Sequence, residues 1–349
     1  MFLSYIHSLR ALAILSIVAV HCLPLFAWDP FRWQDRLLLS LVSNGTVLFV
    51  FVAGFLFQYL SYRFEYRRYL KSKLQNVLLP YVCVSLPMIA YQAVKHYGTF
   101  NPNYIHHWQT AAQNVAWALL TGTHIIVTFW FIPMVAIFYL LAPVLLRIDR
   151  DGRLYYLLPV LLTVTVFVHR PKNPDHIWHS FAYYLPVYLY GMWFSRHRDR
   201  VLAWHDRWLP ALWTLMAGLV WLEVGYLQRA GVIFSADMFS TERGGLDINA
   251  LWKLLLCGAL LGILRRFGGG LHRKLSLLAD TSFGIYFLHQ FIINGFSRLV
   301  HGRSIPIVGM WRYSLVVVAA VAAVVSICVC CLLLARQVLG RHSRSVVGY

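Results

Sequence analysis

The sequence predicts an all-α, polytopic integral membrane protein that forms one domain over residues 1–349. Hydrophobic residues make up 59% of the chain and charged residues 13%, whereas a soluble domain is about one quarter charged. The apolar residues form runs of roughly 16 to 25, close to the length that an α-helix needs to cross a bilayer. Short basic stretches separate these runs, which argues against two soluble domains.

About ten transmembrane helices are expected, because ten apolar windows follow one another along the chain. They cover residues 9–28, 37–60, 77–94, 128–146, 154–168, 181–194, 209–227, 250–264, 275–296 and 313–334. The first window holds Arg10 near its start. The others begin or end within two residues of a cation, in order Arg36, Lys95, Arg147, Arg153, Arg196, Arg207, Arg265, Lys274 and Arg312.

The distribution of Lys and Arg predicts the orientation of these helices. With the N-terminus inside, about twenty cations fall in cytoplasmic segments and about ten in outer segments, as the positive-inside rule requires. An even number of helices then places both termini in the cytoplasm. The net charge of +18 is explained by this pattern, and no nucleic-acid partner is expected because no soluble basic face is present.

Two long loops fall on the predicted outer side. Residues 95–127 contain Trp108 and weak helical periodicity, so we expect this loop to lie on the membrane surface, where its aromatic rings can stack on sugars. Residues 228–249 hold charged residues and glycines and are expected to line a substrate entrance. All six cysteines lie in apolar runs without metal-ligand spacing, so we expect neither disulfides nor a metal site.

Ionisable residues inside a bilayer span are costly, and each is a functional hypothesis. Arg10 and His21 are eleven residues apart, which places both on one helix face, roughly 16 Å apart along the axis. A cation can hold a phosphate and a neutral imidazole can accept a proton from a hydroxyl. The alternative is an orientation anchor and a packing histidine. Glu223 and Lys253 lie at matching depth and are expected to neutralise each other.

A basic run follows the second window and has two possible uses. It consists of Arg63, Arg67, Arg68, Lys71 and Lys73. These cations can bind anionic lipid headgroups, or they can hold the phosphates of a nucleotide-like donor such as coenzyme A. We therefore include Arg68, Lys71 and Lys73, with Arg10, among the candidate donor-binding residues.

Several motifs together resemble the acyltransferase-3 family of integral membrane acyltransferases. The stretch from Ser8 to His21 is similar to the family's Arg-x-x-Ala start with its histidine. The motifs at 49–55, where Ala53 replaces the usual serine, at 129–143 and at 282–289 match the family's order. The basic entry at 71–81 departs from the pattern at Asn76, where a second cation is common.

The resemblance implies transfer of an acyl group, most often acetyl from acetyl-CoA, to a hydroxyl of a carbohydrate. His21 would be the catalytic residue and Arg10 a donor-binding or His-orienting residue, while Trp130, Tyr286 and His289 would line the cavity. The expected partners are acyl-CoA, a free or lipid-linked cell-envelope or exported polysaccharide, membrane lipids and other polysaccharide-biosynthesis proteins. The expected location is the plasma membrane, in bacteria the inner membrane. A stand-alone transferase without a fused esterase-like domain is expected.

The sequence leaves two other interpretations open. The first is a transporter or flippase that moves a lipid-linked sugar without forming a bond; such proteins often have internal repeats, and none is evident in this chain. The second is a structural membrane subunit, which leaves Arg10 and His21 on one face unexplained. Also open are acetyl or succinyl transfer, and a direct transfer or an acyl-histidine intermediate.

Overall fold

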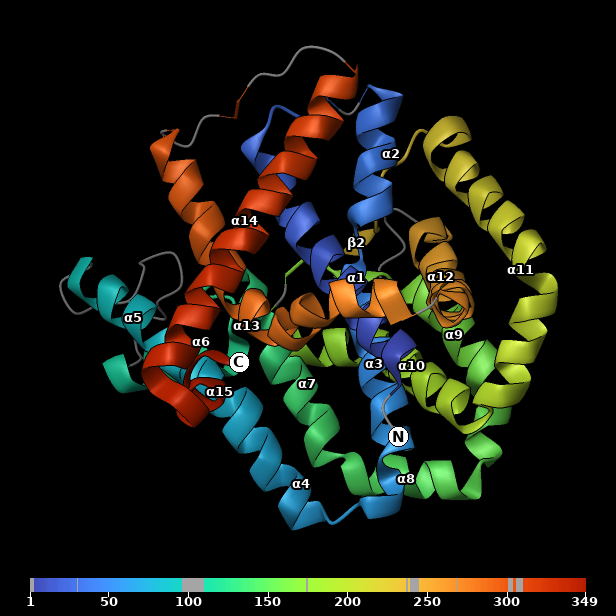
Figure 1. Ribbon diagram of the computed structural model, residues 1–349, viewed down its shortest axis with the longest axis horizontal. Coiled ribbons are helices and arrows are strands. Elements are labelled where there is room, and N and C mark those ends of the chain that lie inside the picture. Colours follow the sequence, from blue (N-terminus) through green and yellow to red (C-terminus); the bar gives the residue numbers. More distant parts are fainter. Residues whose placement is uncertain are drawn as a thin grey trace.

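The computed structural model describes residues 3–29, 31–95, 110–173, 175–236, 238, 245–267, 269–300, 304–305 and 310–349. These residues are almost entirely helical, which confirms the all-α prediction (Figure 1). Their one sheet pairs two short parallel strands, β1 (Arg170–Pro171) and β2 (Phe234–Ser235).

Helices of three kinds make up the rest of the architecture. In chain order, the α-helices are α1 (Ser4–Cys22), α2 (Trp33–Val42), α3 (Gly45–Tyr59), α4 (Tyr66–Lys73), α5 (Leu79–Lys95), α6 (Ala111–Thr121), α7 (Phe131–Leu140), α8 (Ala142–Asp151), α9 (Leu158–Val168), α10 (Ile177–Arg196), α11 (Arg198–Trp221), α12 (Ile248–Arg266), α13 (Gly269–Leu299), α14 (Met310–Leu339) and α15 (Ser343–Val347). Short 3₁₀ segments are η1 (Leu23–Leu25), η2 (Ser61–Arg63), η5 (Val127–Trp130), η6 (Arg153–Leu157) and η8 (Gly340–His342), and π-helical segments are η3 (Leu74–Leu78) and η7 (Leu222–Tyr226).

Each of the ten predicted windows falls on a helix, but fewer helices meet the length and composition of a membrane span. Six segments of the described chain do so, or seven if the bent pair α7 and α8 is one span. Helices α9, α10 and α13, which hold three of the predicted windows, are outside that set. The apolar helices therefore indicate an integral membrane protein. The number of ten transmembrane helices stays a prediction.

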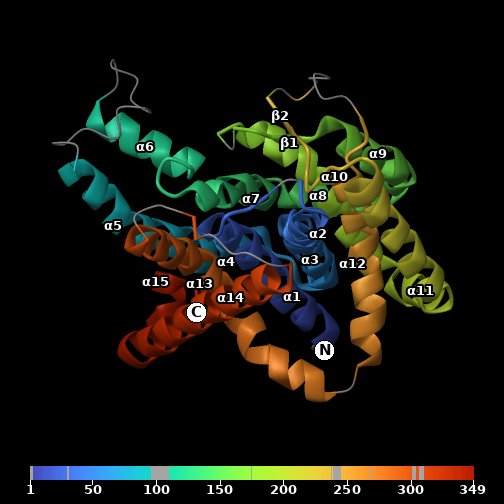
Figure 2. The same cartoon turned by 90° about the horizontal axis from the view of Figure 1, so that it is seen from above.

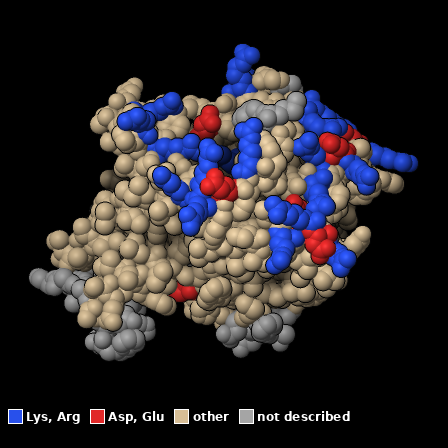
Figure 3. Space-filling model, turned by 90° about the horizontal axis from the view of Figure 1, so that it is seen from below, with Lys and Arg blue, Asp and Glu red and all other residues tan. Residues whose placement is uncertain are grey.

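Charged side chains gather on one face of the molecule. Figure 3 shows Lys and Arg, with fewer Asp and Glu, over part of the face seen from below, and a wide area without charge beside them. Helices α4 and α8, which lie at the bottom of Figure 1, carry several of the basic residues of the chain. Both termini lie on the side of the molecule away from α6 and the strands (Figure 2). The assignment of this side to the cytoplasm stays a prediction.

Helix α1 lies at the centre of the bundle (Figure 2). It packs against α3, α12, α13 and α14, and Leu9, Ala13, Ile14 and Val18 are completely buried. A helix that is apolar on most of its circumference is stable only when other helices surround it. The residues of α1 that are not apolar are therefore presented to protein rather than to lipid.

Two glycines allow α3 and α10 to approach closely. A Cβ atom on Gly54 would lie 2.1 Å from the carbonyl oxygen of Tyr188, and one on Gly191 would lie 2.1 Å from the carbonyl oxygen of Phe51. Small residues permit such backbone contact between membrane helices, where van der Waals packing drives association. Gly54 belongs to the 49–55 motif, so this part of the motif has a packing role.

The window predicted as one helix over 37–60 is two helices, which corrects that prediction. Helix α2 ends at Val42 and α3 begins at Gly45, because Asn44 adopts the left-handed conformation with φ of 57°. Asparagine tolerates this conformation better than most residues, and serine and asparagine side chains compete with helical hydrogen bonds. The Ser43–Asn44 pair therefore interrupts an otherwise apolar run.

Proline explains two further differences from the predicted boundaries. The helix predicted over 9–28 ends at Cys22, and Pro24 is the second residue of the short 3₁₀ segment η1. The helix predicted over 128–146 is bent by 57° between α7 and α8, where Pro143 stands in the first turn of α8. A proline lacks the N–H group and clashes with the carbonyl of the preceding turn.

Polar residues of α12 satisfy the carbonyl groups freed at the end of α2. Lys253 Nζ donates to the carbonyl oxygen of Leu41 at 2.7 Å, and Asn249 Nδ2 donates to that of Ser40 at 3.1 Å. A cation at a helix C-terminus also stabilises the helix dipole. Glu223 instead accepts a hydrogen bond from the Ser40 hydroxyl at 2.7 Å. No ion pair between Glu223 and Lys253 occurs among the described residues, but the two charges interact electrostatically, as predicted. Each also makes its own contact with α2.

The glycine contact of α3 and α10 generates a stability prediction. Gly54→Ala or Gly191→Ala must push the helices apart, and overpacking of this kind costs about 1–3 kcal/mol. Both variants should lower the melting temperature of the purified protein in detergent. The matched control is Gly218→Ala in α11, where an added Cβ meets nothing within 4 Å. Equal melting temperatures for all three variants would contradict the packing role.

Candidate active site

A cavity of about 220 Å³ lies among α1, the α2–α3 break, η5, β1 and α13. His21, Trp130 and Tyr286, three of the candidate site residues, line it together. Asn44 at the helix break and Arg170 on β1 also line it. The cavity therefore joins segments that are far apart in the sequence, and most of its wall is apolar.

His21 stands near the end of α1 with its imidazole ring toward α13. The ring centroids of His21 and His289 are 5.4 Å apart. Among the described residues, no protein group forms a hydrogen bond with the His21 ring, and the side chain is only partly buried. An imidazole that opens to a cavity without a protein partner is available to a substrate proton.

His289 is fully buried and its protonation pattern is set by the backbone. Its Nδ1 lies 3.0 Å from the carbonyl oxygen of Ile285 and 2.8 Å from that of Tyr286. Carbonyl oxygens only accept, so Nδ1 carries the hydrogen in the neutral ring and Nε2 keeps its lone pair. This Nε2 has no hydrogen-bond partner among the described residues. His289 thus offers a buried acceptor beside His21.

Trp130 is held in the cavity wall by a tight turn after α6. Gly122 has φ of 76°, and a Cβ there would lie 2.4 Å from the carbonyl oxygen of Phe129, so only glycine fits. The Trp130 indole stacks on Tyr184 with centroids 5.9 Å apart. Across the cavity, the Tyr286 hydroxyl donates to the carbonyl oxygen of Thr128 at 2.7 Å, which ties α13 to η5.

Arg170 is a site residue that lies in an outer segment of the predicted topology and was not among the candidate site residues. Its guanidinium lies 4.9 Å from the centroid of Trp130 and 5.4 Å from that of Phe234. None of the ion pairs of the described residues includes Arg170. The β1–β2 pairing brings this residue to the cavity, and no local sequence signal distinguishes it from the other loop cations. It adds an uncompensated positive charge beside His21.

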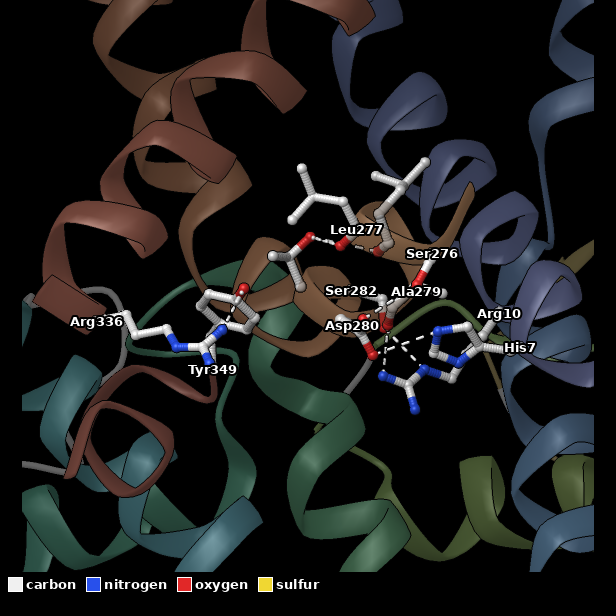
Figure 4. Close-up of polar contacts among 11 residues, drawn as sticks. His7, Arg10, Ser276, Leu277, Ala279, Asp280, Ser282, Arg336 and Tyr349 are labelled. Atoms are coloured by element: carbon white, nitrogen blue, oxygen red, sulfur yellow. Dashed lines mark hydrogen bonds and ion pairs between the residues drawn. The ribbon is translucent and has the colours of Figure 1, made fainter. Parts of the chain in front are cut away.

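Arg10 reaches from α1 to the backbone of α13. Its Nε donates to Ser282 Oγ at 2.9 Å and its Nη2 donates to the carbonyl oxygen of Ala279 at 2.5 Å (Figure 4). The nearby Asp280 carboxylate lies 3.3 Å from His7 Nε2. No ion pair of the described residues includes Arg10, so its guanidinium is fixed in place with Nη1 still available to an anion.

The candidate donor-binding cations are not equivalent in the structure. Lys73 lies 5.2 Å from the ring centroid of Tyr69 and 5.1 Å from that of Tyr139, and it interacts electrostatically with Arg10. Arg68 and Lys71 are exposed. At about 100° per residue, Lys71 projects roughly opposite to Lys73. The structure therefore brings Lys73 toward Arg10, and no described contact does so for Arg68 or Lys71.

Other expectations fall outside this cavity. Trp108 and the rest of residues 96–109 lie outside the described residues. The weak helical periodicity predicted within residues 95–127 corresponds, in the described part, to α6, which begins with a capping box between Thr110 and Gln113. Among the described residues, no group of three or more His, Cys, Asp or Glu side chains could hold a metal ion.

The arrangement combines two chemical capacities. A neutral imidazole in a mostly apolar cavity can accept a proton from a hydroxyl, and fixed cations at the other end of α1 can bind an anion. The two are about three helical turns apart, because His21 follows Arg10 by eleven residues on α1. A ligand that uses both must be long, with an anionic end and a reactive end.

Comparison with known proteins connects this geometry to a family. A family model described as an acyltransferase domain matches residues 3–335 of the 349. The comparisons with curated proteins and with solved structures give no match. The matched region contains α1 with Arg10 and His21, the α2–α3 break and α13, so it includes the whole cavity. Since the match extends over nearly the entire chain, the protein belongs to the acyltransferase-3 family.

Proposed function

We propose that the protein transfers an acetyl group from acetyl-CoA to a hydroxyl of a cell-envelope or exported polysaccharide, or of its lipid-linked precursor. The reaction would take place in the plasma membrane, with both termini in the cytoplasm. Transport of a lipid-linked sugar without chemistry is not favoured, because the family is one of acyltransferases.

The observation that carries the proposal is the unpartnered His21 ring in the central cavity. A histidine kept only for packing would be expected to hydrogen-bond to the protein, as His289 does through Nδ1. The His21 ring instead has a ring contact with His289 and a side open to the cavity. This supports a role toward a substrate rather than toward the fold.

In the direct route, His21 accepts the proton of the acceptor hydroxyl while that oxygen forms a bond to the thioester carbonyl carbon. Collapse of the tetrahedral intermediate breaks the carbon–sulfur bond. His21 then returns its proton to the departing thiolate, which leaves an ester and a free thiol. In the second route, the His21 nitrogen attacks the thioester carbonyl carbon, the carbon–sulfur bond breaks, and the departing thiolate takes the remaining ring proton, which leaves a free thiol and an acyl-imidazole. The acceptor hydroxyl then attacks the acyl carbon, the carbon–nitrogen bond breaks, and the imidazole takes the hydroxyl proton, which leaves the ester and neutral His21.

The size of the cavity supports a donor that enters with its narrow end. The cavity of about 220 Å³ is smaller than the roughly 300–1,000 Å³ of a pocket that encloses a drug-sized ligand. It can receive the acyl group and the end of a pantetheine arm. The phosphates would stay near Arg10 and Lys73, which avoids their burial in hydrocarbon.

Removal of the His21 imidazole should abolish transfer without preventing insertion. His21→Ala removes the general base or nucleophile, and a general base alone contributes about 10²–10⁴-fold in rate. The purified variant is given radiolabelled acetyl-CoA and an envelope glycan fraction, and glycan label and free CoA are counted. His176→Ala, which changes an exposed histidine, is the control.

Glycan label from the His21→Ala variant at the wild-type rate would contradict the proposed role of His21. Label that stays on wild-type protein without acceptor, and is absent from the variant, would support the acyl-histidine route. No CoA release from folded wild-type protein would contradict acyl transfer itself.

Neutralising Arg10 should weaken use of donors that carry phosphate. A hydrogen bond to a charged group contributes about 1.5–3 kcal/mol, so Arg10→Gln should raise KM for acetyl-CoA about 10- to 100-fold. KM for S-acetylpantetheine, which lacks the phosphates, should change little. Steady-state kinetics of both donors test this, with Arg150→Gln on the exposed part of α8 as control. A parallel rise in KM for both donors would point to a structural role for Arg10.

A further inference from the structure

The C-terminal tail, residues 340–349, folds back against the bundle. It consists of η8, α15 and the two residues after it, and α15 contacts α5, η3 and α14. These residues follow the region that the family model matches, which ends at 335. The position of the tail is therefore a feature of this chain beyond what the family match describes.

Several contacts hold the tail on α13 and α14. Arg336 Nη1 donates to the Tyr349 hydroxyl at 3.0 Å, and its guanidinium lies 5.2 Å from the ring centroid (Figure 4). Ser343 is buried and its hydroxyl donates to the carbonyl oxygen of Tyr349. The turn at Gly348, with φ of 82°, lies against the ring of Phe283. The tail is thus docked beside Ser282, the residue that holds Arg10.

The docked tail presents Arg344 to the candidate donor-binding cations. Arg344 is exposed, and its charge interacts with those of both Arg10 and Lys73. Helix α15 also contacts η3, the π-helical turn that directly follows Lys73. Three cations from α1, α4 and the tail therefore share one region.

No carboxylate of the described residues forms an ion pair with any of these three cations. Asp280 is the one described carboxylate that interacts electrostatically with Arg10, and it forms its own contact with His7. Like charges that share a region without a direct ion pair repel one another, and a bound multivalent anion relieves that repulsion. A phosphate or pyrophosphate group has the charge and the acceptor oxygens to contact several cations at once.

We propose that Arg344 is a third phosphate ligand, together with Arg10 and Lys73, so that the C-terminal tail forms part of the donor site. This inference rests on the proposed function, since it assigns the phosphates to the acyl donor. It makes the tail a determinant of selectivity between phosphorylated and phosphate-free thioesters. Phospholipid headgroups carry the same chemistry, and the test separates the two sources.

The test uses the full chain purified in phospholipid-free detergent and isothermal titration with CoA, 3′-dephospho-CoA and pantetheine. Arg344→Gln should weaken CoA binding about 10- to 100-fold, the effect of losing one charge-assisted hydrogen bond. Binding of pantetheine, which lacks phosphate, should be unchanged. Arg344→Lys should restore part of the CoA affinity. The matched control is Arg341→Gln, an exposed tail arginine that, unlike Arg344, is not among the main charges acting on Arg10 and Lys73.

Equal CoA affinity of wild type and Arg344→Gln would overturn the inference while leaving the proposed function in place. If that equality were accompanied by weaker binding of the variant to vesicles of anionic phospholipid, Arg344 would be a headgroup ligand instead. Wild-type protein that is folded but binds no CoA would overturn both the inference and the proposed function. A loss of CoA affinity in Arg341→Gln as large as in Arg344→Gln would also overturn it, because the effect would then be general to the tail.

Discussion

Inside a bilayer, the polar groups of a helix can be satisfied only by protein, and for Ser8 and Arg10 of α1 the partners come from α13. Ser8 Oγ lies 2.7 Å from His272 Nδ1, and Arg10 donates to Ser282 Oγ and to the Ala279 carbonyl oxygen. These contacts fix the rotation and register of α1 against α13. The position of His21 is therefore fixed as well, because His21 lies on the same face of the same helix.

The cavity beside His21 depends on irregular backbone at membrane depth. Such backbone is tolerated in a bilayer only where protein buries it or where it lines a cavity. The α2–α3 break meets both conditions, because Asn44 lines the cavity and Lys253 binds the Leu41 carbonyl oxygen freed at the end of α2. This chain thus builds its cavity by interrupting a helix, and the contacts of Glu223 in η7 and Lys253 in α12 with α2 stabilise the interruption.

The helices, and the placement of Arg10 and His21 on one helix face, could be predicted because their sequence signals are local. An apolar run of sufficient length predicts a membrane helix, and the spacing of Arg10 and His21 on one helix predicts a common face. The breaks at Asn44 and near Pro143 were missed, since hydropathy averages over single residues. Arg170 could not be predicted as a cavity residue, because it reaches the cavity through pairing with a strand more than sixty residues away.

The central claim is that one ligand connects Arg10 to His21 along α1. The most direct measurement is an electron cryo-microscopy map of the His21→Ala variant with acetyl-CoA, in which the missing imidazole prevents turnover. The account predicts density for the thioester in the cavity beside Tyr286, with the phosphate end at Arg10 and Lys73. Donor density at another site, or in the reverse direction, would contradict it.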